Sequence, residues 1–156
     1  MKSFTFENLF VLDLANNHQG EVEHGLAVIE KHGEVVRRCG VRAGLKFQFR
    51  QLDTFIHPDF KERKDIKHIP RFMETAVPVE AYAKLVDAVH RQGMVSICTP
   101  FDEESVDIIL EMGIEVIKVA SCSASDWPLL KKIAQTNRPV IISTAGLSLS
   151  KIDRLV

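Results

Sequence analysis

Two lysine residues lie inside otherwise apolar segments, which is an unusual position for a charged side chain. Lys46 lies in AGLKFQF (43–49) and Lys118 in EVIKVAS (115–121). An ammonium group that is buried without an anion is strongly unfavourable, so each lysine is expected to face a negative charge. The pattern predicts one anion site shared by the two lysines. The alternatives are a structural carboxylate partner for each lysine, or a position at a solvated rim.

Polar side chains that could complete such a site stand at the ends of the same apolar segments and of three others. They are Asp13, Asn16, Asn17 and His18 around the end of 9–15, Gln48 in 43–49, Thr99 at the end of 94–99, Ser121 at the end of 115–121, and Ser143 and Thr144 in 139–145. Hydroxyl donors and ammonium groups together suit a phosphate. The sequence has no GxGxxG or Walker-type loop, which disfavours a dinucleotide or a nucleoside triphosphate.

The segments that carry these side chains alternate with helical patterns. Strands are predicted at 9–15, 43–49, 94–99, 115–121 and 139–145, and helices at 22–39, from Pro78 to about Gly93, from Asp102 to about Gly113, from Pro128 to 135 and from 147 onward. Residues 50–77 are charged and aperiodic, which predicts a long loop with one short helix that covers the strand ends as a lid.

This alternation of nearly continuous apolar strands with helices predicts an α/β fold with a parallel sheet covered by helices. Two architectures fit. One is a (βα)n barrel of the TIM type, stopped after about five strands; the other is a five-stranded doubly wound sheet. In both, ligands bind at the carboxyl ends of the strands, where the polar side chains collect. Periodicity alone does not separate the two.

Composition limits the class of protein. With 46% hydrophobic and 26% charged residues, residues 1–156 are expected to form one ordinary globular domain without a linker. The formal net charge of −1 and the absence of a basic run argue against nucleic-acid binding. No apolar stretch or signal peptide indicates a membrane, so a cytoplasmic location is expected. Cys39, Cys98 and Cys122 have no CxxC spacing and are expected to be free thiols.

Six ordered motifs carry a resemblance to a known family. They are NNHQG (16–20), LKFQ (45–48), TPFDEESVD (99–107), IKVAS (117–121), WPLLKKIA (127–134) and PVIISTAG (139–146). In this order they resemble the N-terminal part of the barrel of the N-acetylneuraminate (sialic acid) synthase family. The resemblance implies a (βα)8 barrel, and it implies a transferase that condenses phosphoenolpyruvate with an N-acetylated amino sugar. The product would be a nine-carbon 2-keto sugar acid, with release of phosphate.

The resemblance also assigns roles to particular residues. It makes Lys46, Thr99, Lys118, Ser121 and Ser143 the phosphoenolpyruvate-binding residues, in agreement with the anion argument. It places Gln48 and Asp13 at the acceptor sugar, with Asp13 and Lys118 as catalytic residues and Asn17 and His18 in support. For His18 the alternative is a loop residue that is hydrogen-bonded to the backbone. Asp13 stands where the family usually has a glutamate, Ser123 where many members have a glutamate, and Ala15 where a glycine is common.

The resemblance further implies a divalent metal, Mn²⁺ or Mg²⁺, in the full-length parent, but its two histidine ligands would lie beyond Val156, so no metal site is expected in this chain. The expected partners are small-molecule substrates and a second copy of the chain in a homodimer. These residues alone are expected to bind anions without catalysing the reaction. The alternative function is a non-catalytic anion-binding module that needs a partner chain.

Overall fold

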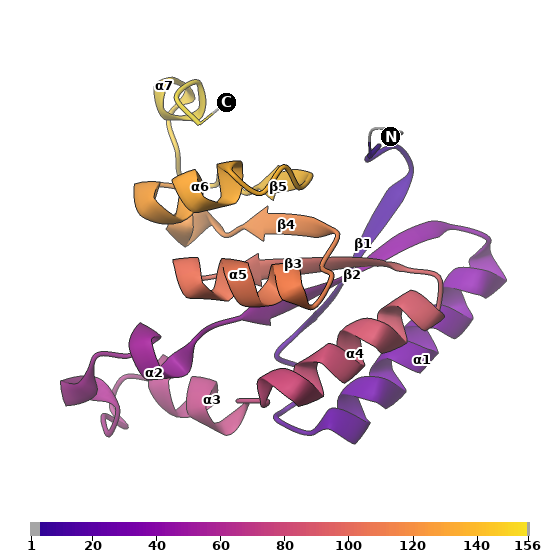
Figure 1. Ribbon diagram of the computed structural model, residues 1–156, viewed down its shortest axis with the longest axis horizontal. Helices are drawn as coiled ribbons and strands as arrows, with labels where there is room; N and C mark the ends of the chain where they lie inside the picture. Colours follow the sequence, from indigo (N-terminus) through magenta and orange to yellow (C-terminus); the bar gives the residue numbers. More distant parts are fainter. Residues whose placement is uncertain (1–3, 156) are drawn as a thin grey trace.

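The computed structural model describes residues 4–155, and its centre is one parallel sheet. The five strands follow the chain order β1-β2-β3-β4-β5 (Figure 1). They are β1 (Leu9–Ala15), β2 (Arg42–Phe49), β3 (Val95–Pro100), β4 (Val116–Val119) and β5 (Val140–Ile142). A doubly wound sheet would reverse its strand order at a switch point, whereas this order is sequential. The structure therefore confirms the open, curled part of a (βα)n barrel and excludes the doubly wound alternative.

The helices that follow the strands lie on one side of the sheet (Figure 1). They are α1 (Val22–Cys39), α4 (Val79–Arg91), α5 (Glu103–Glu111) and α6 (Trp127–Ala134), whereas the short α7 (Leu149–Ile152) stands apart from the sheet, beyond α6 (Figure 1). No helix in residues 4–155 is long and apolar enough to cross a membrane.

The core lies between the sheet and these helices. In β2, Leu45 and Phe47 are fully buried and face the helices, where they join Leu85 and Val86 of α4. Side chains alternate along a strand, so Lys46 and Gln48 must point to the opposite face of the sheet. Because Leu45 and Phe47 are buried against the helices, Lys46 and Gln48 are fixed on the opposite face.

The helix boundaries follow local signals that the sequence already contained. Gly40 adopts the left-handed conformation with φ 62° directly after α1. The Asp102 carboxylate accepts a hydrogen bond from Ser105 N at 2.7 Å and so caps α5. Pro128 occupies the first turn of α6, as predicted.

Three segments differ from the sequence-based prediction, and one of them is the strand expected at 139–145, which spans only Val140–Ile142. Residues 50–77 contain two short helices, α2 (Leu52–Phe55) and α3 (His68–Glu74), and a 3₁₀ turn, η1 (Pro58–Phe60), rather than one helix. These pieces are too short to show a helical period. The strand predicted at 115–121 ends at Val119, and Ser121–Ser123 form a second 3₁₀ turn, η2.

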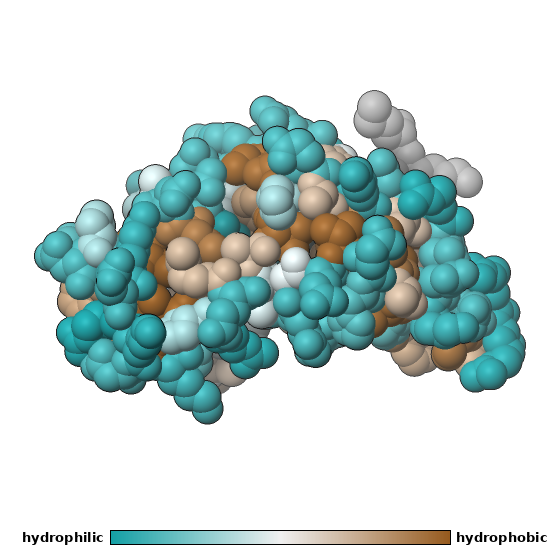
Figure 2. Space-filling model, turned by 90° about the horizontal axis from the view of Figure 1, so that it is seen from below, coloured by the Kyte–Doolittle hydropathy of each residue, from teal (hydrophilic) through white to brown (hydrophobic). Residues whose placement is uncertain are grey.

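Apolar grooves lie beside both edge strands. A cavity of about 600 Å³ is lined by side chains of β1, β2 and α1, including Phe10 and Val35, and one of about 340 Å³ lies between α6 and β5. Apolar side chains also gather in the middle of the face seen in Figure 2, with polar residues around them. Edge strands with apolar flanks are the places where a sheet accepts further chain.

Candidate functional site

The first charged pair of the site joins β1 to β2. Asp13 is the register partner of Lys46, and Lys46 Nζ lies 2.8 Å from Asp13 Oδ1. The Lys46 side chain is only 12% exposed, whereas that of Asp13 is 57% exposed. Lys46 therefore has the structural carboxylate partner that the sequence left open as an alternative. Because Asp13 is largely in solvent, it neutralises Lys46 only in part.

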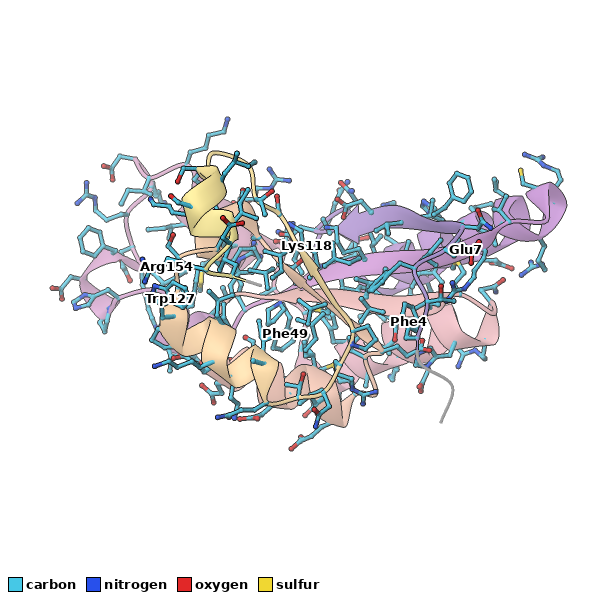
Figure 3. All side chains as sticks on the ribbon, turned by 90° about the horizontal axis from the view of Figure 1, so that it is seen from above. Phe4, Glu7, Phe49, Lys118, Trp127 and Arg154 are labelled. Carbon is cyan, nitrogen blue, oxygen red and sulfur yellow. The ribbon has the colours of Figure 1, made fainter. Side chains whose placement is uncertain are left out.

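The second cation comes from β4. Lys118 pairs with Ile141 of β5, and the register of Val116 with Ile97 in β3 puts Lys118 on the same face as Thr99. Lys118 is half-buried on the strand next to the edge strand β5 and is labelled in Figure 3. Among residues 4–155 it has no carboxylate within ion-pairing distance.

The charges around Lys118 favour the binding of an anion. Partial burial lowers the pKa of Lys118 first, and the positive charge of Lys46 lowers it further. The charges of Cys122 and Asp13 act in the opposite direction. Two ammonium groups thus repel each other on one face of the sheet, and a bound anion would relieve that repulsion.

A hydroxyl group without a partner lies beside these cations. Thr99 is 1% exposed, and its Oγ1 atom is buried without a hydrogen-bond partner. Thr99 is the register partner of Gln48, so the two side chains share the face of Lys46. A buried hydroxyl without a hydrogen bond is unfavourable, and a ligand oxygen at this face would satisfy it.

The predicted serines take different positions. Ser143 follows β5, where its backbone N donates to Val119 O at 3.1 Å, and alternation from Ile141 puts its side chain on the face of Lys118. Ser121 lies exposed in the turn η2 rather than in a strand. Ser123 is 7% exposed in the same turn, with its Oγ 3.9 Å from the sulfur of Cys122.

The loop after β1 lies beside the end of β2. The pairing of β1 with β2 shifts register between Asp13 and Ala15, and Ala15 has a φ of 45°. His18 is 1% exposed, and its Nδ1 accepts a hydrogen bond from Gly20 N at 3.1 Å. Burial lowers the pKa of His18, and the nearby charge of His24 lowers it further. Asn17 is exposed, and its backbone N donates to Leu14 O at 2.8 Å.

Two residues beside the predicted site were not predicted from the sequence. The guanidinium of Arg50 donates to Gln48 Oε1 at 2.8 Å, and the hydroxyl of Tyr82 donates to the backbone carbonyl of Gln48 at 2.6 Å. Arg50 continues the alternation of Lys46 and Gln48, so the period of β2 could have identified it. No such pattern identified Tyr82, because its helical spacing predicts a core residue of α4.

A small cavity of about 50 Å³ adjoins this pair. Its lining includes Asn16, His18, Gln48, Arg50 and Tyr82. The cavity is therefore bordered by the loop after β1, by the end of β2 and by α4.

The residues described do not form a metal centre by themselves. In residues 4–155, no three His, Cys, Asp or Glu side chains are grouped so that they could hold a metal ion. The three cysteines are free; Cys39 and Cys122 are exposed and Cys98 is buried. Burial raises the pKa of the Cys98 thiol, so this thiol stays protonated and unreactive.

Sequence comparisons with known proteins identify a family and several relatives. The model of the NeuB family matches residues 33–156. The chain is 30% identical over 141 residues to the spore coat polysaccharide biosynthesis protein SpsE of Bacillus subtilis, covering 87% of this chain and 36% of SpsE. It is 26% identical over 155 residues to the N,N'-diacetyllegionaminic acid synthase of Campylobacter jejuni, covering 94% of this chain and 45% of that enzyme.

Solved structures give the same result. A structure described as spore coat polysaccharide biosynthesis protein E from Chromobacterium violaceum is 50% identical with a TM-score of 0.93, over 96% of this chain and 44% of that one. The N-acetylneuraminic acid synthetase of Leptospira borgpetersenii shares the fold, with a TM-score of 0.78 and 22% identity, over 95% of this chain and 48% of that one. The chain thus spans less than half the length of these relatives. The family resemblance expected from the motifs is confirmed, and the chain belongs to the NeuB family.

Proposed function

We propose that this chain forms the phosphoenolpyruvate-binding part of a synthase that condenses phosphoenolpyruvate with an N-acetylated amino sugar. The product would be a nine-carbon 2-keto sugar acid, with release of phosphate. The observation that carries the proposal is the shared face of Lys46, Thr99 and Lys118, where two cations and an unpartnered buried hydroxyl meet. An ester with both a phosphate and a carboxylate matches these three groups in charge and in hydrogen bonding.

Each residue at this face has a chemical task in the proposed reaction. Lys46 and Lys118 neutralise the phosphate and carboxylate and stabilise negative charge as it moves toward the leaving phosphate. Thr99 donates a hydrogen bond to a phosphoryl or carboxylate oxygen. Asp13 holds Lys46 in place at 2.8 Å, and its exposed carboxylate can contact the acceptor sugar.

The metal that the family resemblance implies does not fit the described residues alone. Asp13 is the carboxylate on this face, and it is already paired with Lys46. We therefore derive no step through a metal ion from these residues. The proposed binding of phosphoenolpyruvate depends on the two lysines and Thr99 and needs no metal ion.

The names of relatives support a proposal for the acceptor. One is named for N,N'-diacetyllegionaminic acid and others for N-acetylneuraminate 9-phosphate and pseudaminic acid. We propose an acylated amino sugar of this kind as the acceptor, because the products after which these relatives are named are sugar acids.

Turnover tests the proposal. The whole synthase of which this chain is proposed to be a part is incubated with phosphoenolpyruvate, Mn²⁺ or Mg²⁺ and N-acetylmannosamine, because these residues alone are expected to bind anions without catalysing the reaction. Inorganic phosphate and the mass of the product are measured. Release of phosphate that depends on the sugar, with a product heavier than the sugar by a pyruvate unit, is the expected result. Binding of phosphoenolpyruvate without turnover by any acylated amino sugar would favour the anion-binding module. Absence of binding would contradict both.

A further inference from the structure

Arg50 is enclosed at the carboxyl end of β2. Its guanidinium carbon lies 4.3 Å from the ring centre of Phe72 in α3 and 4.0 Å from that of Phe101, which follows β3. Its Nε atom is buried and has no hydrogen-bond partner. Two aromatic faces on a guanidinium hold it through cation–π attraction and leave it little freedom to rotate.

This cation has no counter-charge among the described residues. No carboxylate of residues 4–155 lies within ion-pairing distance of Arg50. The Asp102 carboxylate accepts hydrogen bonds from Gln51 N and Ser105 N instead. Arg50 is only partly buried, but burying part of a guanidinium without a counter-charge is unfavourable, so the side chain is held here at some cost to stability.

The contact that Arg50 does make is specific. Its Nη2 donates to Gln48 Oε1 at 2.8 Å. A guanidinium is only a donor, so the oxygen of the Gln48 amide must face Arg50, and the Nε2 amino group must face away. The hydroxyl of Tyr82 holds the backbone of the same residue at 2.6 Å. Gln48 is thus fixed in both its main chain and its side chain.

We propose that Arg50 is a positioning residue that holds Gln48 as a hydrogen-bond donor toward an oxygen atom of the acceptor sugar. The inference rests on the proposed function, because Gln48 lies on the face of Lys46 and Thr99. It adds a selectivity rule: the acceptor presents an oxygen, such as an acyl carbonyl, to Gln48 Nε2. A group that can only donate is rejected, because two donors would then meet.

The same arrangement links residues 50–77 to the site. Phe72 in α3 forms one wall of the sandwich around Arg50. Displacement of α3 would free the guanidinium and with it the Gln48 amide. This segment therefore acts on acceptor binding through Arg50, and phosphoenolpyruvate binding at Lys46 and Lys118 does not depend on that contact.

Two variants separate the Gln48 hydrogen-bond donor from the Arg50 group that orients it. Gln48→Glu keeps an oxygen toward Arg50 and adds an ion pair, but it removes the Nε2 donor. Arg50→Met keeps the Gln48 donor but removes the group that orients it. Arg91→Met is the matched control, because Arg91 is an exposed arginine at the end of α4, away from Arg50 and its two aromatic neighbours.

Calorimetry of the protein with N-acetylmannosamine, in the presence of phosphoenolpyruvate, gives the first readout. Gln48→Glu and Arg50→Met should each raise the Kd of the sugar about tenfold, as expected for one hydrogen bond to a charged or oriented group, and the double variant should be no worse than Gln48→Glu. The Kd of phosphoenolpyruvate should stay within about twofold. Arg50→Lys should raise the Kd of the sugar by an intermediate amount, and Arg91→Met should change neither Kd.

A second readout needs no ligand. The side-chain amide of Gln48 should give a high NMR order parameter, typical of a rigid group, in the wild-type protein and in Arg91→Met, and a clearly lower one in Arg50→Met. An unchanged order parameter in Arg50→Met, or an unchanged sugar affinity where Gln48→Glu weakens it, would overturn the positioning role. Failure of the wild-type protein to bind phosphoenolpyruvate would instead overturn the proposed function, and the order parameter would still decide the role of Arg50.

Discussion

Substitution of Lys118 by methionine should separate stability from ligand binding. Methionine keeps most of the apolar stem of the lysine but removes its ammonium group. In the free protein that ammonium is partly desolvated and is repelled by Lys46, which is why its pKa is lowered. We therefore expect the free energy of unfolding to stay the same or to rise by up to about 1 kcal/mol, since solvent screens a half-exposed charge.

The effect on phosphoenolpyruvate binding should have the opposite sign. A hydrogen bond to a charged group contributes about 1.5–3 kcal/mol, and each 1.4 kcal/mol is about a tenfold change in Kd. Lys118→Met should therefore raise the Kd about 10- to 150-fold. Lys46→Met should weaken binding at least as much, because it also leaves the Asp13 carboxylate, 2.8 Å from Nζ in the wild-type protein, to repel the phosphate.

Calorimetric titration with phosphoenolpyruvate measures the affinities, and thermal unfolding measures the stabilities. Lys84→Met is the matched control, because Lys84 is exposed on α4, on the far side of the sheet. It should leave the Kd unchanged. The reasoning is refuted if both Lys46→Met and Lys118→Met bind phosphoenolpyruvate as tightly as the wild-type protein does.

Four other predictions follow from separate features. Ala15 has a φ of 45°, so Ala15→Gly should raise the free energy of unfolding by about 0.5–1 kcal/mol in denaturant titrations; a loss of stability would refute the strain. The pKa of buried His18 lies below its ordinary 6.5, so the stability held above pH 6.5 should fall as the pH drops through the lowered value, and His18→Gln should lose this pH dependence in unfolding measurements. Residues 50–77 should exchange amide hydrogens faster than β2 and β4, and equal protection would contradict a lid. The chain studied alone should sediment as a dimer that buries more than about 1,200 Å² through its edge strands, whereas a monodisperse monomer without exposed apolar surface would contradict this.

The order of the elements could be predicted because each boundary has a local cause. Gly40 and Asp102 mark helix ends through backbone conformation and capping, and both act as expected. Apolar runs marked every strand, and alternation placed Lys46 and Gln48 on one face. The choice between the two parallel architectures needed the strand order, which depends on contacts that single-sequence periodicity does not contain.

Other features arise only from the tertiary fold. The ion pair of Lys46 with Asp13 depends on the register of β1 against β2, which shifts just after Asp13. The setting of Arg50 depends on Phe72 and Phe101, which are more than 20 residues away along the chain and meet only at the sheet edge. Ser121 is in a turn because β4 is shorter than its apolar run.

A crystal structure of the protein with phosphoenolpyruvate tests the central claim most directly. The account predicts phosphoenolpyruvate on the sheet face opposite the helices, with its anionic groups against Lys46 Nζ and Lys118 Nζ and a hydrogen bond from the unpartnered Thr99 Oγ1. Phosphoenolpyruvate bound elsewhere, with Thr99 and both lysines free of it, would contradict the account.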